Sequence, residues 1–195
     1  MRFTILRLSP QITRSSEALL IVDAVSALGA DRLYMDAWGV DVVVSCSQKG
    51  LMTPPGLGLC AVGPRALERM LTARLPKYYW DLRRYLDSLE KDTTPFTPAV
   101  SLWYGLREAL RAVRREGIEA VFARHARLAA ATRVAVKELG LGLFPQHPAN
   151  TLTAIRLPAE VDGKRLVRHL RGAVRDGLCG RAGPPSPDES SGSLI

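Results

Sequence analysis

Two short, nearly continuous runs of apolar residues restrict the fold of this chain more than any other feature. ALLIV occupies residues 18–22 and is followed by Asp23, and VDVVV occupies residues 40–44. Runs this short and this rich in β-branched residues are typical of strands buried in a parallel sheet. Ligands of such sheets bind at the carboxyl ends of the strands. The runs therefore predict an α/β fold and direct attention to the polar residues that follow them.

The next part of the chain adds a third strand and a first helix. GLGLCAV, residues 56–62, predicts a shorter strand. A helix is expected from Pro64 to about residue 74, because proline suits the first helical turn. The stretch over residues 77–96 is aromatic and fits no regular period, so we expect it to be irregular.

Two long helices follow, separated by a glycine. Thr97 is a candidate N-cap with Pro98 as the first helical residue, and Gly117 is the expected end of that helix. A second helix is expected over residues 118–139. Beyond it, the sequence predicts a strand and a helix of a smaller α/β unit, over residues 151–158 and 162–174. We place the domain boundary near Gly117.

The two ends of the chain differ from its middle. Residues 1–17 contain apolar residues but fit neither period, so they form an atypical N-terminal segment. Residues 177–195 are rich in Gly, Pro and Ser, a composition that cannot bury a core, and we expect a disordered tail there. The sequence has neither a leader pattern nor an apolar run long enough to span a membrane, which leads us to expect a soluble, cytoplasmic chain with no membrane partner.

The formal net charge of +8 raises the question of nucleic-acid binding. Clustered arginines bind phosphates without needing a particular fold. Here acidic residues are interleaved with the bases, and three arginines near the end of the chain lie opposite the apolar positions of one expected helix, namely Arg168, Arg171 and Arg175. We interpret these bases as solvated faces and expect no nucleic-acid partner. A small basic nucleic-acid-binding protein stays open as an alternative.

Cysteine and histidine give no sign of a metal site. Cys46, Cys60 and Cys179 are too far apart for a C-x-x-C pair, and the three histidines are scattered singly. We therefore expect no bound metal and a reducing compartment. Free cysteine is usually buried, so Cys46 and Cys60 are expected to be small core residues.

An aspartate and a lysine follow neighbouring predicted strands, separated by about one βαβ-like excursion. Asp23 ends the first strand, and the segment VVVSCSQKG leads from the second strand to Lys49. This pair suits pyridoxal phosphate, which needs a lysine to hold its aldehyde as a Schiff base and an anion to keep its ring nitrogen protonated. On these two residues alone a structural interpretation stays open, in which Asp23 caps a following helix and Lys49 is a solvated loop residue.

Longer segments around these residues resemble one enzyme family. LLIVDAVSALGADRLYMDAWGVDVVVSCSQKGLMTPPGLGL, residues 19–59, resembles the class V aminotransferases of the alanine–glyoxylate and serine–pyruvate group. In that family a D-A-V-S-x-L-G segment, and an S-Q-K segment followed by P-P-G, carry the cofactor. TPFTPAVSLWYGLREAL is similar to the family's helix entry, and LGLGLFPQHPANTLTAIRLP resembles the start of its small domain.

The resemblance implies a partial PLP-dependent transferase fold of type I, like that of aspartate aminotransferase. Residues 18–117 would form the C-terminal part of the large pyridoxal-phosphate-binding domain. Residues 118–176 would form a partial small domain of the α/β class.

Carried over by position, the resemblance also implies roles for five residues. Lys49 would hold pyridoxal 5′-phosphate as a Schiff base and move protons, and Asp23 would pair with the ring nitrogen. Val25 would lie against the ring, and Gln48 would bond the phosphate. Thr97 would give a hydroxyl to the phosphate in the partner subunit of a homodimer, although its role as a plain N-cap stays open. Two serines remain as supporting donors, Ser26 and Ser47.

The implied reaction transfers an amino group from an amino acid such as serine or alanine to a 2-oxo acid such as glyoxylate or pyruvate. The family's glycine-rich phosphate turn, its stacking aromatic residue and its carboxylate-binding R-I-G arginine have no counterpart in this sequence. We therefore expect a truncated chain with impaired activity, and SSGS at residues 190–193 suggests a frameshift as its origin. A non-catalytic, unstable remnant and a lyase on the same fold, such as a desulfurase, stay open as alternatives.

Overall fold

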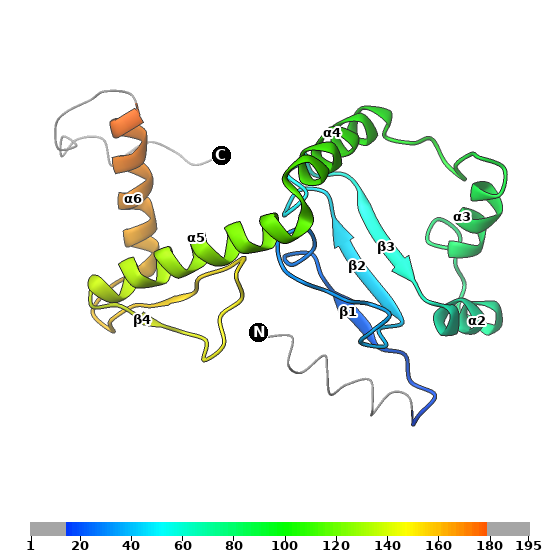
Figure 1. Ribbon diagram of the computed structural model, residues 1–195, viewed down its shortest axis with the longest axis horizontal. Coiled ribbons are helices and arrows are strands. Elements are labelled where there is room, and N and C mark those ends of the chain that lie inside the picture. The colour runs from blue at the N-terminus through cyan, green and yellow to red at the C-terminus, as the bar shows by residue number, and fades with distance from the viewer. Residues whose placement is uncertain (1–14, 179–195) are drawn as a thin grey trace.

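The computed structural model describes residues 15–178, and the side chains of residues 15–174. A three-stranded sheet with helices α2 to α4 forms the first part of the described chain, and α5, a two-stranded sheet and α6 form the second (Figure 1). Strands and helices both contribute to each part. The α/β class expected from the sequence is therefore confirmed.

The three-stranded sheet has the order β1 (Ile21–Asp23), β2 (Val42–Cys46) and β3 (Gly58–Val62). β1 runs parallel to β2, with Asp23 opposite Val44, and β3 runs antiparallel to β2. The first two strands begin two to three residues later than the sequence predicts, because the Asp41 carboxylate accepts the N–H of Leu20 at 2.8 Å before the ladder starts. The parallel pair brings the carboxyl ends of β1 and β2 to one edge of the sheet.

The core of this part lies around β1, β2 and the connection between them. Four residues are buried together, and six half-buried side chains pack against them: Val22, Ala24, Val40 and Val43, with Leu20, Ala27, Leu28, Leu33, Met35 and Trp38. The expected βαβ-like excursion is wrong in one respect, because the connection consists of turns and contains no helix. Gly29 and Gly39 have φ values of 80° and 60°, which a helix does not accommodate. The core therefore depends on turns that fold back onto the strands.

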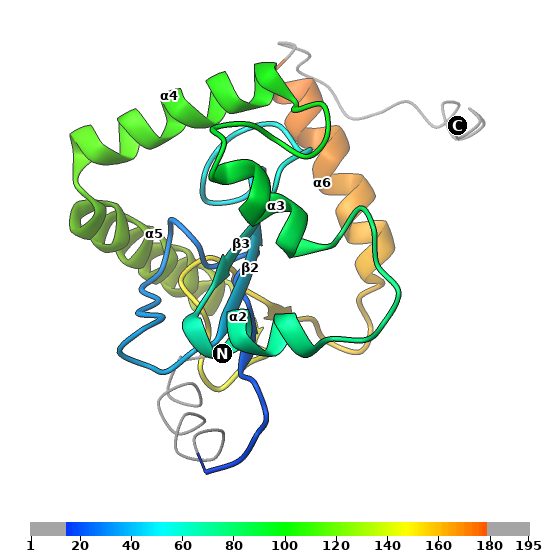
Figure 2. The ribbon, with the colours of Figure 1, turned by 90° about the vertical axis from the view of Figure 1, so that its right-hand side faces the viewer.

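Helices α2 (Pro64–Thr72) and α3 (Leu82–Leu89) lie on the β3 side of the sheet (Figures 1 and 2). α2 begins at Pro64 as the sequence predicts. α3 contradicts the expectation of an irregular stretch over residues 77–96. Its first turn is capped by Asp81, whose carboxylate accepts the Arg83 N–H at 3.2 Å. The Arg84 guanidinium stacks 4.1 Å from the centre of the Tyr78 ring, which also holds this helix in place.

Helix α4 (Val100–Glu116) starts later than the sequence predicts. Its N-cap is Ala99, which makes no side-chain capping bond, so the prediction of Thr97 as the cap and Pro98 as the first helical residue is wrong. The Val100 N–H donates to the Pro98 carbonyl in a turn that precedes the helix. The predicted stop is confirmed, because Gly117 has a φ of 87° and separates α4 from α5 (Ile118–Glu138).

The second part of the described chain contains β4 (Gly142–Leu143), β5 (Ile155–Arg156) and α6 (Gly163–Leu178). The strands pair antiparallel, and a strand and a helix form at the predicted positions, although the strand is limited to Ile155–Arg156. α6 extends to Leu178, so residues 177 and 178 are helical, and the remainder of the predicted tail, with SSGS, lies outside the described residues. The division into two domains at Gly117 stays a prediction.

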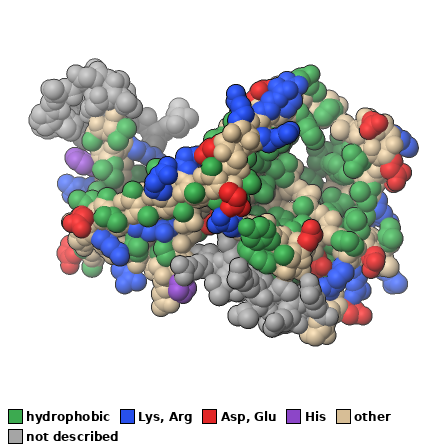
Figure 3. All heavy atoms as spheres, viewed as in Figure 1, with side chains coloured by type: hydrophobic (Ala, Val, Ile, Leu, Met, Phe, Trp, Pro, Cys, Tyr) green, Lys and Arg blue, Asp and Glu red, His purple; other side chains and the backbone are tan. Residues whose placement is uncertain are grey.

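Many large apolar side chains are exposed in this chain (Figure 3). Trp80 is 80% exposed, and on α6 Val167 and Leu170 are 47% and 52% exposed. Cys60 is exposed and Cys46 is half-buried, so the expectation that both are core residues is wrong for Cys60, which lies on β3 at an edge of the sheet. Cys179 lies outside the described residues. Much of the apolar surface of α2 to α4 and of α6 is therefore not covered by the part of the chain that the structure describes.

Candidate active site

The candidate site lies at the edge of the sheet where β1 and β2 end. Asp23 is the last residue of β1, and Lys49 follows the end of β2 by three residues, in the loop that leads to β3. Both side chains are exposed, and so is Gln48. The parallel pairing of the two strands is the reason that the aspartate and the lysine share one edge.

Hydrogen bonds fix the backbone and carboxylate of Asp23 at the start of a turn. Its Oδ1 accepts the N–H of Val25 at 2.8 Å, and the N–H of Ala24 donates to the Val44 carbonyl at 2.8 Å. The carboxylate therefore closes a local turn. The described chain has no helix between β1 and β2, so the alternative in which Asp23 caps a following helix is wrong. Val25 is half-buried beside it.

The turn after Asp23 contacts the residue after Lys49 directly. A Cβ atom added to Gly50 would collide with the carbonyl oxygen of Leu28, and one added to Gly29 would lie 3.2 Å from the carbonyl oxygen of Gly50. Both positions therefore need glycine, because two backbone segments meet there. This contact joins the Asp23 turn to the Lys49 loop, and neither periodicity nor propensity in the sequence points to it.

Helix α4 packs behind the Lys49 loop. A Cβ atom added to Gly56 would lie 2.5 Å from Leu102 Cδ1, and one added to Gly105 would lie 3.9 Å from the Thr53 methyl carbon. Leu102 and Gly105 therefore face the loop from α4. The loop is bounded on one side by the Asp23 turn and on another by this helix.

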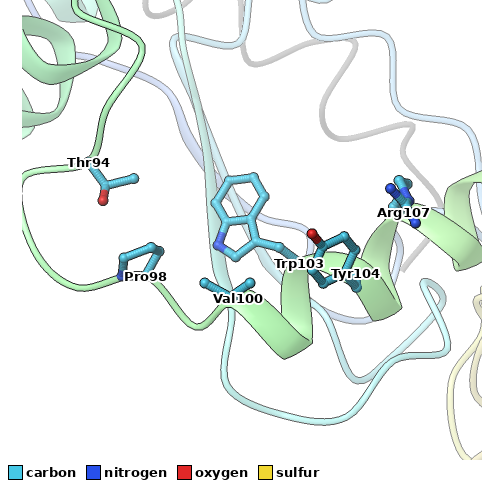
Figure 4. Close-up of a pocket in the computed structure, with 6 residues that line it drawn as sticks. All are labelled: Thr94, Pro98, Val100, Trp103, Tyr104 and Arg107. Carbon is cyan, nitrogen blue, oxygen red and sulfur yellow. The ribbon is translucent and has the colours of Figure 1, made fainter.

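Thr97 lies in a different segment of the chain from the other four predicted residues. It is exposed in the segment that leads into α4, and the structure gives it no hydrogen bond to Asp23 or Lys49. A hollow of about 520 Å³ adjoins this segment and is lined by Thr94, Pro98, Val100, Trp103, Tyr104 and Arg107. Figure 4 shows the Trp103 and Tyr104 side chains extending from α4, with Thr94 and Pro98 on the preceding segment. Of the five residues predicted for the site, four lie at or just after the ends of β1 and β2, and Thr97 lies in the segment before α4.

Two classes of site are not found in the described residues. No three His, Cys, Asp or Glu side chains within residues 15–174 are grouped so that they could hold a metal ion. In the same described part of the chain, no helix has the length and apolar character needed to cross a bilayer.

Comparisons with known proteins find one family and several similar proteins. The model of the family described as "Aminotransferase class-V" matches residues 5–183. The chain is 46% identical over 153 residues to the soluble hydrogenase 42 kDa subunit of Anabaena cylindrica, with 77% of this chain and 40% of that protein covered. It is 44% identical over 155 residues to the serine–glyoxylate aminotransferase of Arabidopsis thaliana, with 77% of this chain and 39% of that protein covered.

Among solved structures, the alanine–glyoxylate aminotransferase of Nostoc sp. superimposes on this chain with a TM-score of 0.80 at 33% identity. The superposition covers 86% of this chain and 46% of that structure. The chain thus spans less than half the length of the relatives it matches.

Proposed function

The chain belongs to the class-V aminotransferase family and has part of its α/β fold, and from that premise we propose that it serves the transfer of an amino group from an amino acid to a 2-oxo acid. Serine or alanine is the proposed donor, and glyoxylate or pyruvate is the proposed acceptor. The names of the Arabidopsis and Nostoc relatives support this class of substrates. The observation that carries the proposal is the parallel pairing of β1 and β2, which places Asp23 at the end of one strand and Lys49 three residues after the end of the other.

The donor set at this edge fits pyridoxal 5′-phosphate. An exposed amine and an exposed carboxylate follow adjacent strands, and the contact between the Gly29 and Gly50 backbones keeps their two segments together. When bound, the cofactor supplies an electron-accepting ring on which an amino group can be exchanged between two carbon skeletons. Lys49 and Asp23 are the residues proposed to hold it.

Each residue of the edge has a proposed task. The Lys49 Nζ would hold the cofactor through its aldehyde, and as a free amine it would accept and return a proton at that nitrogen. Asp23 presents a carboxylate oxygen to the ring nitrogen, while its Oδ1 is steadied by the Val25 N–H. The half-buried Val25 offers an apolar surface to the ring, and the Gln48 amide donates to the phosphate.

Thr97 is proposed to act in a homodimer. Its side chain is exposed, which supports a contact with the phosphate held by a partner subunit. The exposed Trp103 and Tyr104 beside it, 55% and 57% exposed, offer apolar area for such an association. The cytoplasmic location expected from the lack of a leader pattern stays a prediction.

An activity assay tests this proposal. Amino-acid-dependent conversion of glyoxylate or pyruvate is measured for the wild-type chain, for Lys49→Ala and for Lys137→Ala, an exposed lysine on α5 that serves as the matched control. Because Asp23 and Lys49 are open to water in this chain, we expect slow turnover that Lys49→Ala abolishes and Lys137→Ala preserves. Equal rates for wild type and Lys49→Ala would instead support the non-catalytic alternative.

One observation favours the nucleic-acid alternative. Arg111, Arg114 and Arg115 line a hollow near the end of α4, where Figure 3 shows blue side chains gathered. Glu108 lies in the same hollow and pairs with Arg111 at 2.8 Å, which lowers the local positive charge. Nucleic-acid binding that weakens steeply as salt rises, without covalent attachment of cofactor, would favour this alternative.

A further inference from the structure

The loop that carries Lys49 contains a fully buried serine, Ser47, that bonds across it. Ser47 is 0% exposed, although it lies two residues before the exposed Lys49 and directly before the exposed Gln48. A hydroxyl that is fully removed from water is costly unless it is hydrogen-bonded. Its partners therefore indicate what it contributes.

The Ser47 hydroxyl joins both ends of the loop. Its Oγ donates to the Pro54 carbonyl at 2.8 Å and accepts the Leu57 N–H at 3.3 Å. The Ser47 N–H donates to the Leu57 carbonyl at 3.1 Å. Residues seven and ten positions further along the chain are thus held by one side chain.

The Ser47 backbone is held from the same side by a second buried hydroxyl. Thr53, which is 8% exposed, donates from Oγ1 to the Ser47 carbonyl at 2.8 Å, and its N–H donates to the same oxygen at 3.1 Å. Between them, the Met52 N–H donates to the Lys49 carbonyl at 2.9 Å, and Met52 adopts a φ of 58°. This left-handed conformation is strained for a side chain of that size and needs surrounding contacts to persist.

We propose that Ser47 is a positioning residue, whose buried hydroxyl, with that of Thr53, closes the loop so that the Lys49 amine is held at the edge beside Asp23. The inference rests on the proposed function, because the amine is positioned for attachment of the cofactor. It assigns Ser47 no contact with cofactor or substrate. Loss of its hydroxyl leaves the Leu57 N–H and the Pro54 carbonyl without their partner and loosens the loop around Lys49.

The test compares Ser47→Ala with Ser45→Ala. Ser45 is also buried, at 7% exposure, and its Oγ donates to the Ala24 carbonyl at 3.2 Å, but it lies within β2 and makes no bond across the loop. Thr53→Val is the second loop variant, because valine keeps the shape of threonine and removes only the hydroxyl. Two quantities are measured in the whole 195-residue chain. One is amide hydrogen exchange, and the other is the fraction of Lys49 labelled after incubation with pyridoxal phosphate and reduction with borohydride.

We expect Ser47→Ala to speed exchange of the Thr53 and Leu57 amides by about tenfold, with a parallel fall in the labelled fraction of Lys49. Thr53→Val should act in the same direction, and Ser45→Ala should leave both quantities near wild type. Wild-type labelling and exchange in both loop variants, or an equal loss in Ser45→Ala, would overturn the inference. A wild-type chain that takes no label at Lys49 would overturn the proposed function, and the inference with it.

Discussion

The three-stranded sheet and helix α6 bury their apolar residues to very different extents. Val22 and Val43 are 8% and 6% exposed in β1 and β2, whereas Val167 and Leu170 on α6 are 47% and 52% exposed. The amphipathic pattern of α6 predicts a buried face, but no element of the described chain covers that face. The edge that carries Asp23 and Lys49 is therefore built on a part of the chain that has its own core, and α6 is not.

The largest expected difference comes from a matched pair of valine substitutions. Val43→Ala removes buried methyl groups from β2 and should lower the free energy of unfolding by about 2–3 kcal/mol. Val167→Ala removes the same groups from an exposed helical position and should change it by less than about 0.5 kcal/mol. Denaturant unfolding of both variants measures the contrast, and equal losses would show that α6 is as well packed as the sheet.

A matched pair of glycine substitutions should give effects of opposite sign. Gly50→Ala forces a Cβ against the Leu28 carbonyl and should destabilise the chain by about 1–3 kcal/mol. Gly172→Ala places a methyl group in open space within α6 and should stabilise that helix by up to about 1 kcal/mol.

Unfolding curves and helix content by circular dichroism measure these two glycine effects. A tolerated alanine at position 50 would contradict the close approach of the two backbones at the candidate site.

The smallest expected effect concerns the ion pair that links the two regions across Gly117. Arg124 on α5 donates to the Glu116 carboxylate on α4 at 2.7 and 3.0 Å, and this hydrogen bonding lowers the pKa of Glu116 below its ordinary value of 4.5. A carboxylate with a lowered pKa in the folded state stabilises the fold above its ordinary pKa. That contribution is lost as the pH falls through the folded-state pKa.

Thermal midpoints of wild type and Glu116→Gln should therefore differ slightly at neutral pH and converge in acid. The effect is small because the pair is open to solvent. An offset between the two midpoints that does not change with pH would contradict a stabilising role for the Glu116–Arg124 ion pair.

Part of the fold could be predicted from the sequence because local patterns decide it. The apolar runs before Asp23 and Ser45 predict β1 and β2, and Gly117 ends α4 as expected. Helix α3 was not predicted. Arg84 of this helix stacks on the rings of Tyr78 and Phe96, which both lie outside the helix, and such contacts are not visible in a local pattern. Interactions between distant positions outweigh the local pattern there.

Some residues of the candidate site can likewise be predicted from the sequence, and others only from the structure. Asp23 and Lys49 stand out in the sequence because each follows a strand pattern. The resemblance marks Ser47 as a supporting donor, but the sequence shows neither its burial nor its partner Thr53, because both depend on how the loop closes. The need for glycine at position 50 is visible only in the structure, where the turn after β1 packs against it.

The most direct test of the account is a peptide map of the full chain after incubation with pyridoxal phosphate and reduction with borohydride. The central claim is that the ends of β1 and β2 present one lysine as a specific site for the cofactor aldehyde. The account predicts that the label is concentrated on the peptide containing Lys49, and that Asp23→Asn lowers the labelled fraction. A label spread evenly over exposed lysines such as Lys91 and Lys137 would contradict it.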